Sequence, residues 1–371
     1  MIFAIALILL VIGSVAFHFL SPWYLTPLAS DWSTIDDTIN ITFWITGAVF
    51  VAVNLFMAWC VIKFRYKKNV RSEYQPENKK LELWLTGLTA LGVAAMLAPG
   101  LYVWADFVNP PEDADILEVV GKQWQWSYRF PGDDGVLGTV DTRHTTAANP
   151  LGMNPNDPNG QDDIIVASGN LHIPIDRPVK MLLRSQDVLH DFAVAEFRVK
   201  MDLVPGIVTY LWLTPTVLGT YDVLCEELCG IGHYKMRSQV VVDTQDDYTA
   251  WLKTHPTYAQ TVAGTGPASN VGLSLVEKGR KLAESSGCVA CHSIDGSAGV
   301  GPTWLGLYGK TETLADGRTV VVDEAYLKES ILLPNVSIVQ GYAPIMPPSS
   351  FTDEELDALI AYTKELVGSG S

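Results

Sequence analysis

Three long apolar runs fill the start of this 371-residue chain and constrain its fold more than any other feature. They cover residues 1–20, 39–62 and 83–105 in round bounds, with only isolated polar residues inside them. Each run reaches the roughly 20 residues that a helix needs to cross the hydrocarbon core of a bilayer. The sequence therefore predicts a membrane anchor over residues 1–108, built from three transmembrane helices.

Basic residues indicate the orientation of these helices. No Lys or Arg precedes residue 63, and the segment between the second and third runs then carries seven of them. They are Lys63, Arg65, Lys67, Lys68, Arg71, Lys79 and Lys80. Because cytoplasmic loops are enriched in Lys and Arg, we expect this loop in the cytoplasm and everything after residue 108 outside. In a bacterium, that is the periplasmic side of the inner membrane.

The first apolar run has an alternative interpretation as a cleaved signal peptide. It lacks the basic n-region and the small-residue cleavage site that such peptides carry. We therefore favour an uncleaved helix.

Soft metal ligands crowd one turn-rich loop further along the chain. Cys225, Cys229, His233 and Met236 follow the spacing C-x3-C-x3-H-x2-M, and His190 stands upstream. Thiolate and thioether sulfurs are soft ligands and imidazole suits copper, so the pattern indicates a copper electron-transfer centre. The alternative is a disulfide between the two Cys, which leaves the spacing of the His and Met unexplained.

A second redox motif lies downstream at Cys288, Cys291 and His292. C-x-x-C-H is the attachment sequence of c-type haem, in which the His binds the iron. The alternative is a zinc-binding or redox C-x-x-C that a His follows by chance. Met346 lies between prolines before the last predicted helix and is the candidate for the second axial ligand. Met/His ligation raises the potential of a haem.

Cysteine usage supports both motifs. Four of the five Cys belong to them and Cys60 stands alone in an apolar run, so no pair remains for a structural disulfide. Bacteria assemble copper-thiolate centres and c-type haem outside the cytoplasm, which agrees with the predicted orientation.

Residues 109–258 alternate short β-rich runs with turns, which predicts an all-β antiparallel sandwich or barrel. The segment 131–163 is rich in Gly, Asn, Asp and Pro and predicts a surface-exposed insertion. The expected strands are Ile116–Val120, Gln123–Phe130, Ile164–Ser168, Val179–Ser185, Val208–Leu213, Gly219–Leu224 and Ser238–Val242.

The C-terminal part is predicted to be an all-α haem domain behind a flexible linker. Residues 259–270 are small, polar and uncharged, as linkers are. Within residues 271–371, helical periodicity covers residues 273–284, 323–332 and 353–366. Thr352 and Glu355 form a capping box at the start of the last of these helices.

Negative charge concentrates after the membrane anchor. The chain carries 41 acidic and 25 basic residues, and the whole net charge of −16 falls after residue 108. Such a surface does not suit nucleic acid. It suits a basic donor protein, although solubility alone explains it equally well.

The loop from Cys225 to Met236 resembles the dinuclear copper A site of cytochrome c oxidase subunit II. The segments around Pro302 and Met346 resemble class I cytochromes c, so the chain as a whole resembles a subunit II with a fused cytochrome c domain, as in caa3-type oxidases. The resemblance implies a cupredoxin-like sandwich, two coppers and one covalent haem c. The implied copper ligands are Cys225 and Cys229 as bridges, His190 and His233 on one copper each, and Met236 and the Glu227 carbonyl as weak ligands.

The resemblance also suggests roles for three further side chains. Trp124 matches the tryptophan that accepts the electron, with plain β-sheet packing as the alternative. Glu82 matches the glutamate at the mouth of a proton path, or is a helix-end carboxylate favoured by the helix dipole. The side chain of Glu227 would bind a magnesium ion shared with subunit I, since carboxylate oxygens suit Mg²⁺.

The implied function is the oxidoreductase subunit that receives electrons for a respiratory oxidase. A donor, such as a soluble cytochrome c or a quinol-oxidising complex, would reduce haem c, then copper A, then subunit I, which reduces oxygen and pumps protons. Subunit III is a further expected partner. The alternative is the electron relay of a nitric oxide reductase-type complex. A nitrous oxide reductase needs a His-rich catalytic copper cluster, and the remaining histidines are too scattered to form one: His18, His144, His172 and His255. A quinol oxidase subunit without copper lacks the two loop thiols, which are present here.

Overall fold

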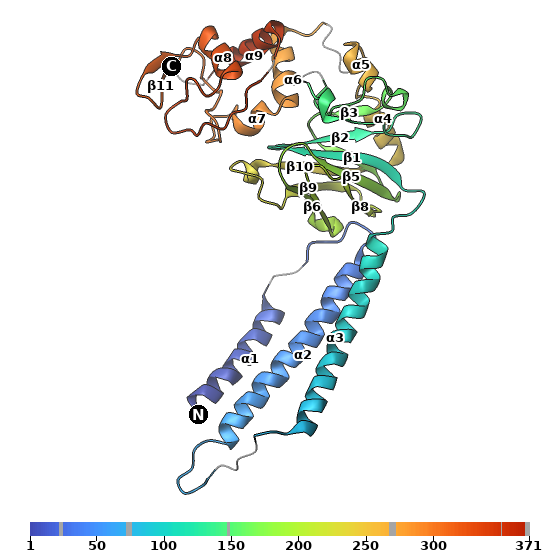
Figure 1. Ribbon diagram of the computed structural model, residues 1–371, viewed down its shortest axis with the longest axis vertical. Coiled ribbons are helices and arrows are strands. Elements are labelled where there is room, and N and C mark those ends of the chain that lie inside the picture. Colours follow the sequence, from blue (N-terminus) through green and yellow to red (C-terminus); the bar gives the residue numbers. More distant parts are fainter. Residues whose placement is uncertain (22–24, 72–75, 147–148, 267–271, 350, 368–371) are drawn as a thin grey trace. The chain divides into compact units, whose positions relative to one another are not determined.

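The computed structural model describes residues 1–21, 25–71, 76–146, 149–266, 272–349 and 351–367. The chain divides into two compact units, residues 1–28 with 32–110, and residues 29–31 with 111–371. Figure 1 shows long helices in the first unit, and strands followed by short helices in the second.

The first unit contains the three predicted membrane helices, α1 Ile2–Leu20, α2 Ser33–Lys63 and α3 Lys79–Phe107. Their mean hydropathies of 2.6, 2.2 and 1.6 and their lengths are sufficient to cross a bilayer, which confirms the predicted anchor. Helices α2 and α3 are longer than their apolar runs because polar ends continue the hydrogen bonding. At the start of α3, for example, the Asn78 side chain accepts a 3.0 Å hydrogen bond from the N–H of Leu81 and caps the helix.

Within this unit, α1 contacts α2 through a small buried cluster that includes Ala4, Leu7 and Ala58. No side chain of α3, which is described over its whole length, is buried. Leu88 and Leu91 of α3 are 67 and 68 % exposed. Apolar helix surface on this scale requires lipid or another protein chain, so the unit anchors the protein in a membrane.

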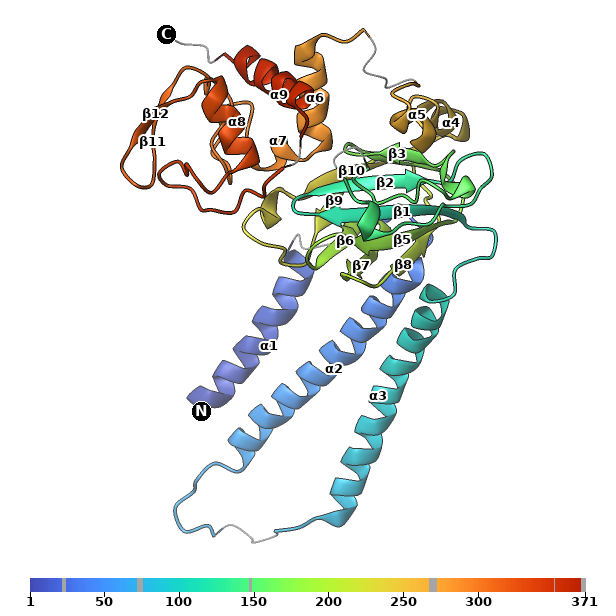
Figure 2. The same cartoon turned by 45° about the horizontal axis from the view of Figure 1, so that its top comes forward.

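The second unit begins with two five-stranded sheets packed face to face, as Figure 2 also shows. The first sheet has the order β3 Ile164–Val166, β2 Gln125–Phe130, β1 Asp115–Lys122, β5 Val179–Ser185 and β8 Thr209–Leu213. The second has the order β4 Leu171–Pro174, β10 Arg237–Asp243, β9 Gly219–Cys225, β6 His190–Val194 and β7 Val199–Leu203. The predicted sandwich is confirmed, with two corrections. The strands β6 and β7 were not predicted, and the pairs β1–β5 and β4–β10 are parallel rather than antiparallel.

Strand β2 is buried on both faces, which the sequence did not predict. Trp126, Tyr128 and Phe130 lie in the core on one face, each at most 2 % exposed. Arg129, on the other face, is 3 % exposed because the insertion 131–163 covers it. A helix that follows the last strand, α4 Gln245–Leu252, adds Trp251 against Phe130, with ring centroids 5.5 Å apart.

The insertion 131–163 is therefore not the exposed loop that its composition predicted. Leu151 and Met153 are at most 2 % exposed, and Asp163 is fully buried. The Arg129 guanidinium holds the insertion in place, with Nε 2.9 Å from Glu118 and Nη1 2.7 Å from Asp163 and from the carbonyl of Gly138. Charged side chains can be buried here because they neutralise one another.

The start of the predicted linker is helical. Its first residues form a short helix, α5 Tyr258–Val262, whose Tyr258 is buried. Of the remainder, residues 267–270 lie outside the described part of the chain.

The C-terminal part contains the helices α6 Leu275–Ser285, α7 Cys288–Cys291, α8 Glu324–Leu332 and α9 Asp353–Glu365. The predicted helices are present, and Thr352 and Glu355 form the expected capping box of α9. A small hairpin, β11 Thr311–Thr313 with β12 Thr319–Val321, interrupts the predicted all-α pattern. Helices α6 and α9 pack closely at Gly279, where a Cβ atom would lie 1.9 Å from the carbonyl oxygen of Ala358.

Candidate metal centre

The predicted copper ligands come from two neighbouring strands and one loop. Strand β9 ends at Cys225, and the chain turns back through a short 3-10 helix, His233–Lys235, into β10. His190 is the first residue of β6, which pairs with β9 so that Phe192 lies opposite Cys225. This pairing brings His190 to the Cys225 end of the loop, although the two residues are far apart in sequence.

Cys225 lies at the centre of the first half of the cluster. Its Sγ is 3.7 Å from the Sγ of Cys229, 4.0 Å from Nδ1 of His190 and 3.3 Å from the carbonyl oxygen of Glu227. Both Cys are free thiols, so the alternative of a disulfide is wrong. The ligand atoms of His190 and the two Cys all lie within 4.8 Å of one another.

Cys229 lies at the centre of the second half. Its Sγ is 3.5 Å from Nδ1 of His233 and 3.9 Å from the thioether sulfur of Met236. Two thiols, two imidazole nitrogens, a thioether and a carbonyl therefore face one small volume. This soft donor set fits copper, and the thioether and carbonyl exceed what a four-ligand zinc site uses.

The centre is dry. His190 is fully buried, and Cys225, Cys229 and Met236 are 8, 2 and 1 % exposed. Burial raises the pKa of Cys229 to about 12, helped by the neighbouring charge of Cys225. Burial also raises the pKa of Cys225, but hydrogen bonds from His190 and the backbone outweigh it and bring that pKa to about 6.

Asp187 orients the buried histidine. Its Oδ1 lies 2.8 Å from Nε2 of His190, which leaves Nδ1 directed at Cys225. Burial raises the pKa of Asp187, but the hydrogen bonds from His190 and from backbone N–H groups outweigh it and hold the pKa below its usual range. A carboxylate behind a histidine in this way fixes the ring and makes it a better metal ligand. Sequence reasoning missed Asp187, although it stands three residues before His190.

Trp124 packs directly on the ligand loop. Its indole Nε1 donates a 3.1 Å hydrogen bond to the carbonyl of Cys229, and the residue is 8 % exposed. The next aromatic residues of the segment, Trp126 and Tyr128, lie in the core. Glu227 is half-buried beside the sulfurs, and Glu82 is exposed in the first turn of α3.

The C-x-x-C-H motif forms α7 and the residue after it. Nδ1 of His292 lies 2.7 Å from the carbonyl oxygen of Pro302, to which it donates, so Nε2 remains available to a metal. The Trp304 ring stacks near the imidazole with centroids 5.5 Å apart. A Cβ atom on Gly301 would lie 2.6 Å from Cε1 of His292, so only glycine leaves room for this ring.

The thiols and the imidazole of this motif suit a covalently attached haem. Cys288 and Cys291 are free, and burial raises both thiol pKa values to about 11. Burial also lowers the pKa of His292, which keeps the ring neutral and able to bind iron. Met346 is half-buried in an irregular segment flanked by Pro344 and Pro347.

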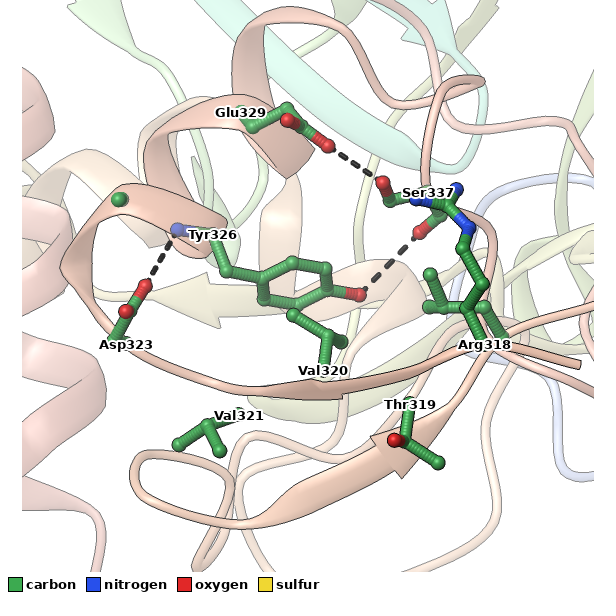
Figure 3. A pocket seen from close by; sticks show the side chains of 10 residues that line it. Arg318, Thr319, Val320, Val321, Asp323, Tyr326, Glu329 and Ser337 are labelled. Atoms are coloured by element: carbon green, nitrogen blue, oxygen red, sulfur yellow. Dashed lines mark hydrogen bonds between the residues drawn. The ribbon is translucent and has the colours of Figure 1, made fainter.

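An open cavity of about 480 Å³ lies elsewhere in the C-terminal part, between β12 and α8 (Figure 3). The Tyr326 hydroxyl donates a 3.4 Å hydrogen bond to the carbonyl of Ser337 across it, and the Ser337 hydroxyl donates one of 2.6 Å to Glu329. None of the residues that line this cavity is a predicted redox ligand, so it does not mark the redox chemistry.

Comparisons with known proteins match both parts of the second unit to known families. The family described as "Cytochrome C oxidase subunit II, periplasmic domain" matches residues 116–244, and the family described as "Cytochrome c" matches residues 276–366. The alternative cytochrome c oxidase subunit 2 of Bradyrhizobium diazoefficiens is 59 % identical over 69 % of this chain and 92 % of the relative. The cytochrome c oxidase subunit 2 of Alkalihalophilus pseudofirmus is 25 % identical over 85 % of this chain and 83 % of the relative.

Among solved structures, the periplasmic domain of subunit II of the cytochrome oxidase of Bradyrhizobium japonicum is 24 % identical, with a TM-score of 0.30. That match covers 39 % of this chain and 96 % of the other. The curated relatives and the two family matches decide the assignment: the chain belongs to the cytochrome c oxidase subunit 2 family and carries a cytochrome c domain after its periplasmic domain.

Proposed function

We propose that this chain receives electrons on haem c, passes them through the copper centre and delivers them to subunit I of a caa3-type oxidase. Its place as the electron-receiving subunit of a respiratory oxidase, associated with subunit I, follows from the family. The observation that carries the finer proposal is the convergence of two thiols, two imidazoles, a thioether and a carbonyl on one buried volume.

In the proposed copper A site, Cys225, Cys229, His190 and His233 would hold the two coppers. Met236 and the Glu227 carbonyl complete the set. The bound copper pair would take up and release one electron at a time. The chain's own contribution is to hold the ligands still and to exclude water, through burial and through the hydrogen bond between Asp187 and His190.

In the proposed haem site, Cys288 and Cys291 would hold the haem covalently, and His292 and Met346 would bind its iron. The bound haem would exchange one electron with the donor. The Pro302 carbonyl fixes the His292 ring by accepting its Nδ1–H, and the stacked Trp304 limits its rotation.

Three further roles belong to the same proposal. Trp124, in hydrogen-bond contact with the ligand loop, accepts the electron at the copper centre. The half-buried Glu227 side chain binds magnesium together with subunit I. Glu82, exposed at the start of α3, lies at the mouth of a proton path.

We infer that the chain has four segments, and we infer its membrane and its partners. The segments are an anchor over residues 1–108, a copper domain over 109–258, a linker over 259–270 and a haem domain over 271–371. The membrane is the bacterial inner membrane, with the last two domains on the periplasmic side. The other partners are subunit III and an electron donor, such as a soluble cytochrome c or a quinol-oxidising complex. The net charge of −16 on this chain suits a basic donor. The family match does not favour a nitric oxide reductase-type complex.

The test is electron paramagnetic resonance of the oxidised, copper-loaded full chain in detergent, with Cys225→Ser and Cys60→Ser compared. We expect a delocalised mixed-valence copper signal beside low-spin haem in the wild type and in Cys60→Ser. Cys225→Ser should lose the copper signal and keep the haem. A wild-type signal localised on one copper would contradict the bridging roles, and an unchanged mixed-valence signal in Cys225→Ser would contradict its assignment as a copper ligand.

A further inference from the structure

The carbonyl oxygen of Cys229 accepts hydrogen bonds from two consecutive side chains. Gln123 donates from Nε2 at 2.7 Å, and Trp124 donates from its indole Nε1 at 3.1 Å. Both donors belong to the turn between β1 and β2, and the acceptor belongs to the loop between β9 and β10. The backbone of a candidate bridging cysteine is therefore fixed by side chains more than a hundred residues away in sequence.

Two glycines make room for these donors. A Cβ atom on Gly230 would lie 2.8 Å from Nε2 of Gln123, and Gly230 also has a φ of +114°, which favours glycine. A Cβ atom on Gly232 would lie 2.3 Å from Cδ2 of Trp124. The loop backbone is thus shaped to accept the amide and the indole together, since a side chain at either glycine would displace one of them.

Gln123 is also connected to the other side of the ligand cluster. Its backbone N–H donates a 2.7 Å hydrogen bond to Oδ2 of Asp187, whose Oδ1 lies 2.8 Å from Nε2 of His190. One residue therefore joins the histidine ligand from β6 to the cysteine ligand from the loop. Gln123 is exposed, yet its side-chain amide makes this hydrogen bond to the loop backbone.

We propose that Gln123 is a positioning residue, which holds the copper-binding loop and the Trp124 indole in one fixed arrangement for electron transfer. The proposal rests on the copper A function proposed above. Without the Gln123 amide, the indole N–H would be the remaining side-chain donor to the Cys229 carbonyl among the hydrogen bonds described here. The indole and the loop could then move apart, and the copper ligands would shift when the charge on the metal changes.

The test compares Gln123→Leu, Gln123→Glu and the control Gln239→Leu in the copper-loaded full chain. Gln123→Glu keeps the size of the side chain but loses the donor at neutral pH. Gln239 lies on β10 and makes only a long 3.4 Å contact with Asp222 and one of 3.5 Å with Asn170, so its substitution controls for the loss of a surface amide. The measurements are copper content, the copper resonance spectrum, and the rate at which photoreduced haem c reduces the copper.

In both Gln123 variants, we expect photoreduced haem c to reduce the copper about fivefold more slowly than in the wild type. One lost hydrogen bond changes the population of the fixed arrangement by about that ratio. Their copper hyperfine pattern should also shift, while Gln239→Leu matches wild type. Loss of copper from both Gln123 variants but not from the control would support the same role. Wild-type spectra and rates in both Gln123 variants would overturn the proposal. A defect in Gln123→Leu that Gln123→Glu lacks would also overturn it, because such a defect would depend on the shape of the side chain and not on its hydrogen-bond donor. If the wild type itself lacks a mixed-valence signal, the copper A proposal fails first.

Discussion

Replacing Arg129 by methionine should strongly destabilise the copper domain. Arg129 is 3 % exposed and contacts Glu118, Asp163 and the Gly138 carbonyl, all at 2.9 Å or less. Methionine fills similar volume but leaves two buried carboxylates without this partner. Removing one member of a buried ion pair costs about 3–5 kcal/mol. For a domain of this size, that lowers the melting midpoint by about 6–20 °C.

The assay is thermal unfolding of the full chain, with copper absorbance reporting on the sandwich and haem absorbance on the C-terminal domain. The matched control is Arg143→Met, because the Arg143 side chain pairs with Asp141 at 2.6 Å but is 86 % exposed. The control should leave both transitions unchanged, and Arg129→Met should lower the copper transition alone. A copper midpoint within about 2 °C of wild type in Arg129→Met would refute the argument that this network holds the insertion on the sheet.

Three further predictions follow from other contacts. Asp187→Asn should weaken copper binding about 10–100-fold, because His190 loses its carboxylate partner, and competition with a chelator measures this; unchanged affinity would contradict the orienting role. Gly279→Ala should lower the melting midpoint of the haem domain, because the new Cβ atom would lie 1.9 Å from the carbonyl oxygen of Ala358. Such overpacking costs about 1–3 kcal/mol. An unshifted haem transition would show that α6 and α9 can separate freely. Burial raises the pKa of Glu118, but Arg129 and Arg184 outweigh burial and hold this pKa below 4.5. The contribution of Glu118 to stability is therefore present above pH 4.5 and is lost as the pH falls through the pKa of the folded state. The unfolding free energy of the copper domain should therefore fall between pH 6 and pH 3, and it should fall less in Arg129→Met. Equal pH slopes in the two proteins would contradict the role of Arg129 in stabilising the Glu118 carboxylate.

The sequence was most informative where the chemistry depends on local spacing. The ligands within the Cys225–Met236 loop, the C-x-x-C-H motif and the Thr352–Glu355 capping box each lie within a few residues, so a motif describes them fully. The apolar runs predicted the membrane helices for the same reason, because the length of a span is a property of one segment.

The sequence was least informative where a residue depends on a distant partner. Strand β7 alternates Lys200 and Asp202 with apolar residues and is too short and charged to stand out. The insertion has a loop composition, yet Asp163 is buried because Arg129 of another strand neutralises it. The burial of Trp124 likewise depends on glycines in a loop that only the fold brings next to it.

The ends of the insertion have a consequence for how this domain can change over evolution. Phe130, just before the insertion, and Ile164, just after it, are paired neighbours on β2 and β3. The insertion is thus an enlarged hairpin turn, and each doubling of a flexible loop costs only about 0.6 kcal/mol in chain entropy. Length variation among descendants should therefore collect at exposed positions of the insertion such as Asp133 and Asp134, and should stop short of Leu151 and Met153, whose burial makes them part of the domain's core.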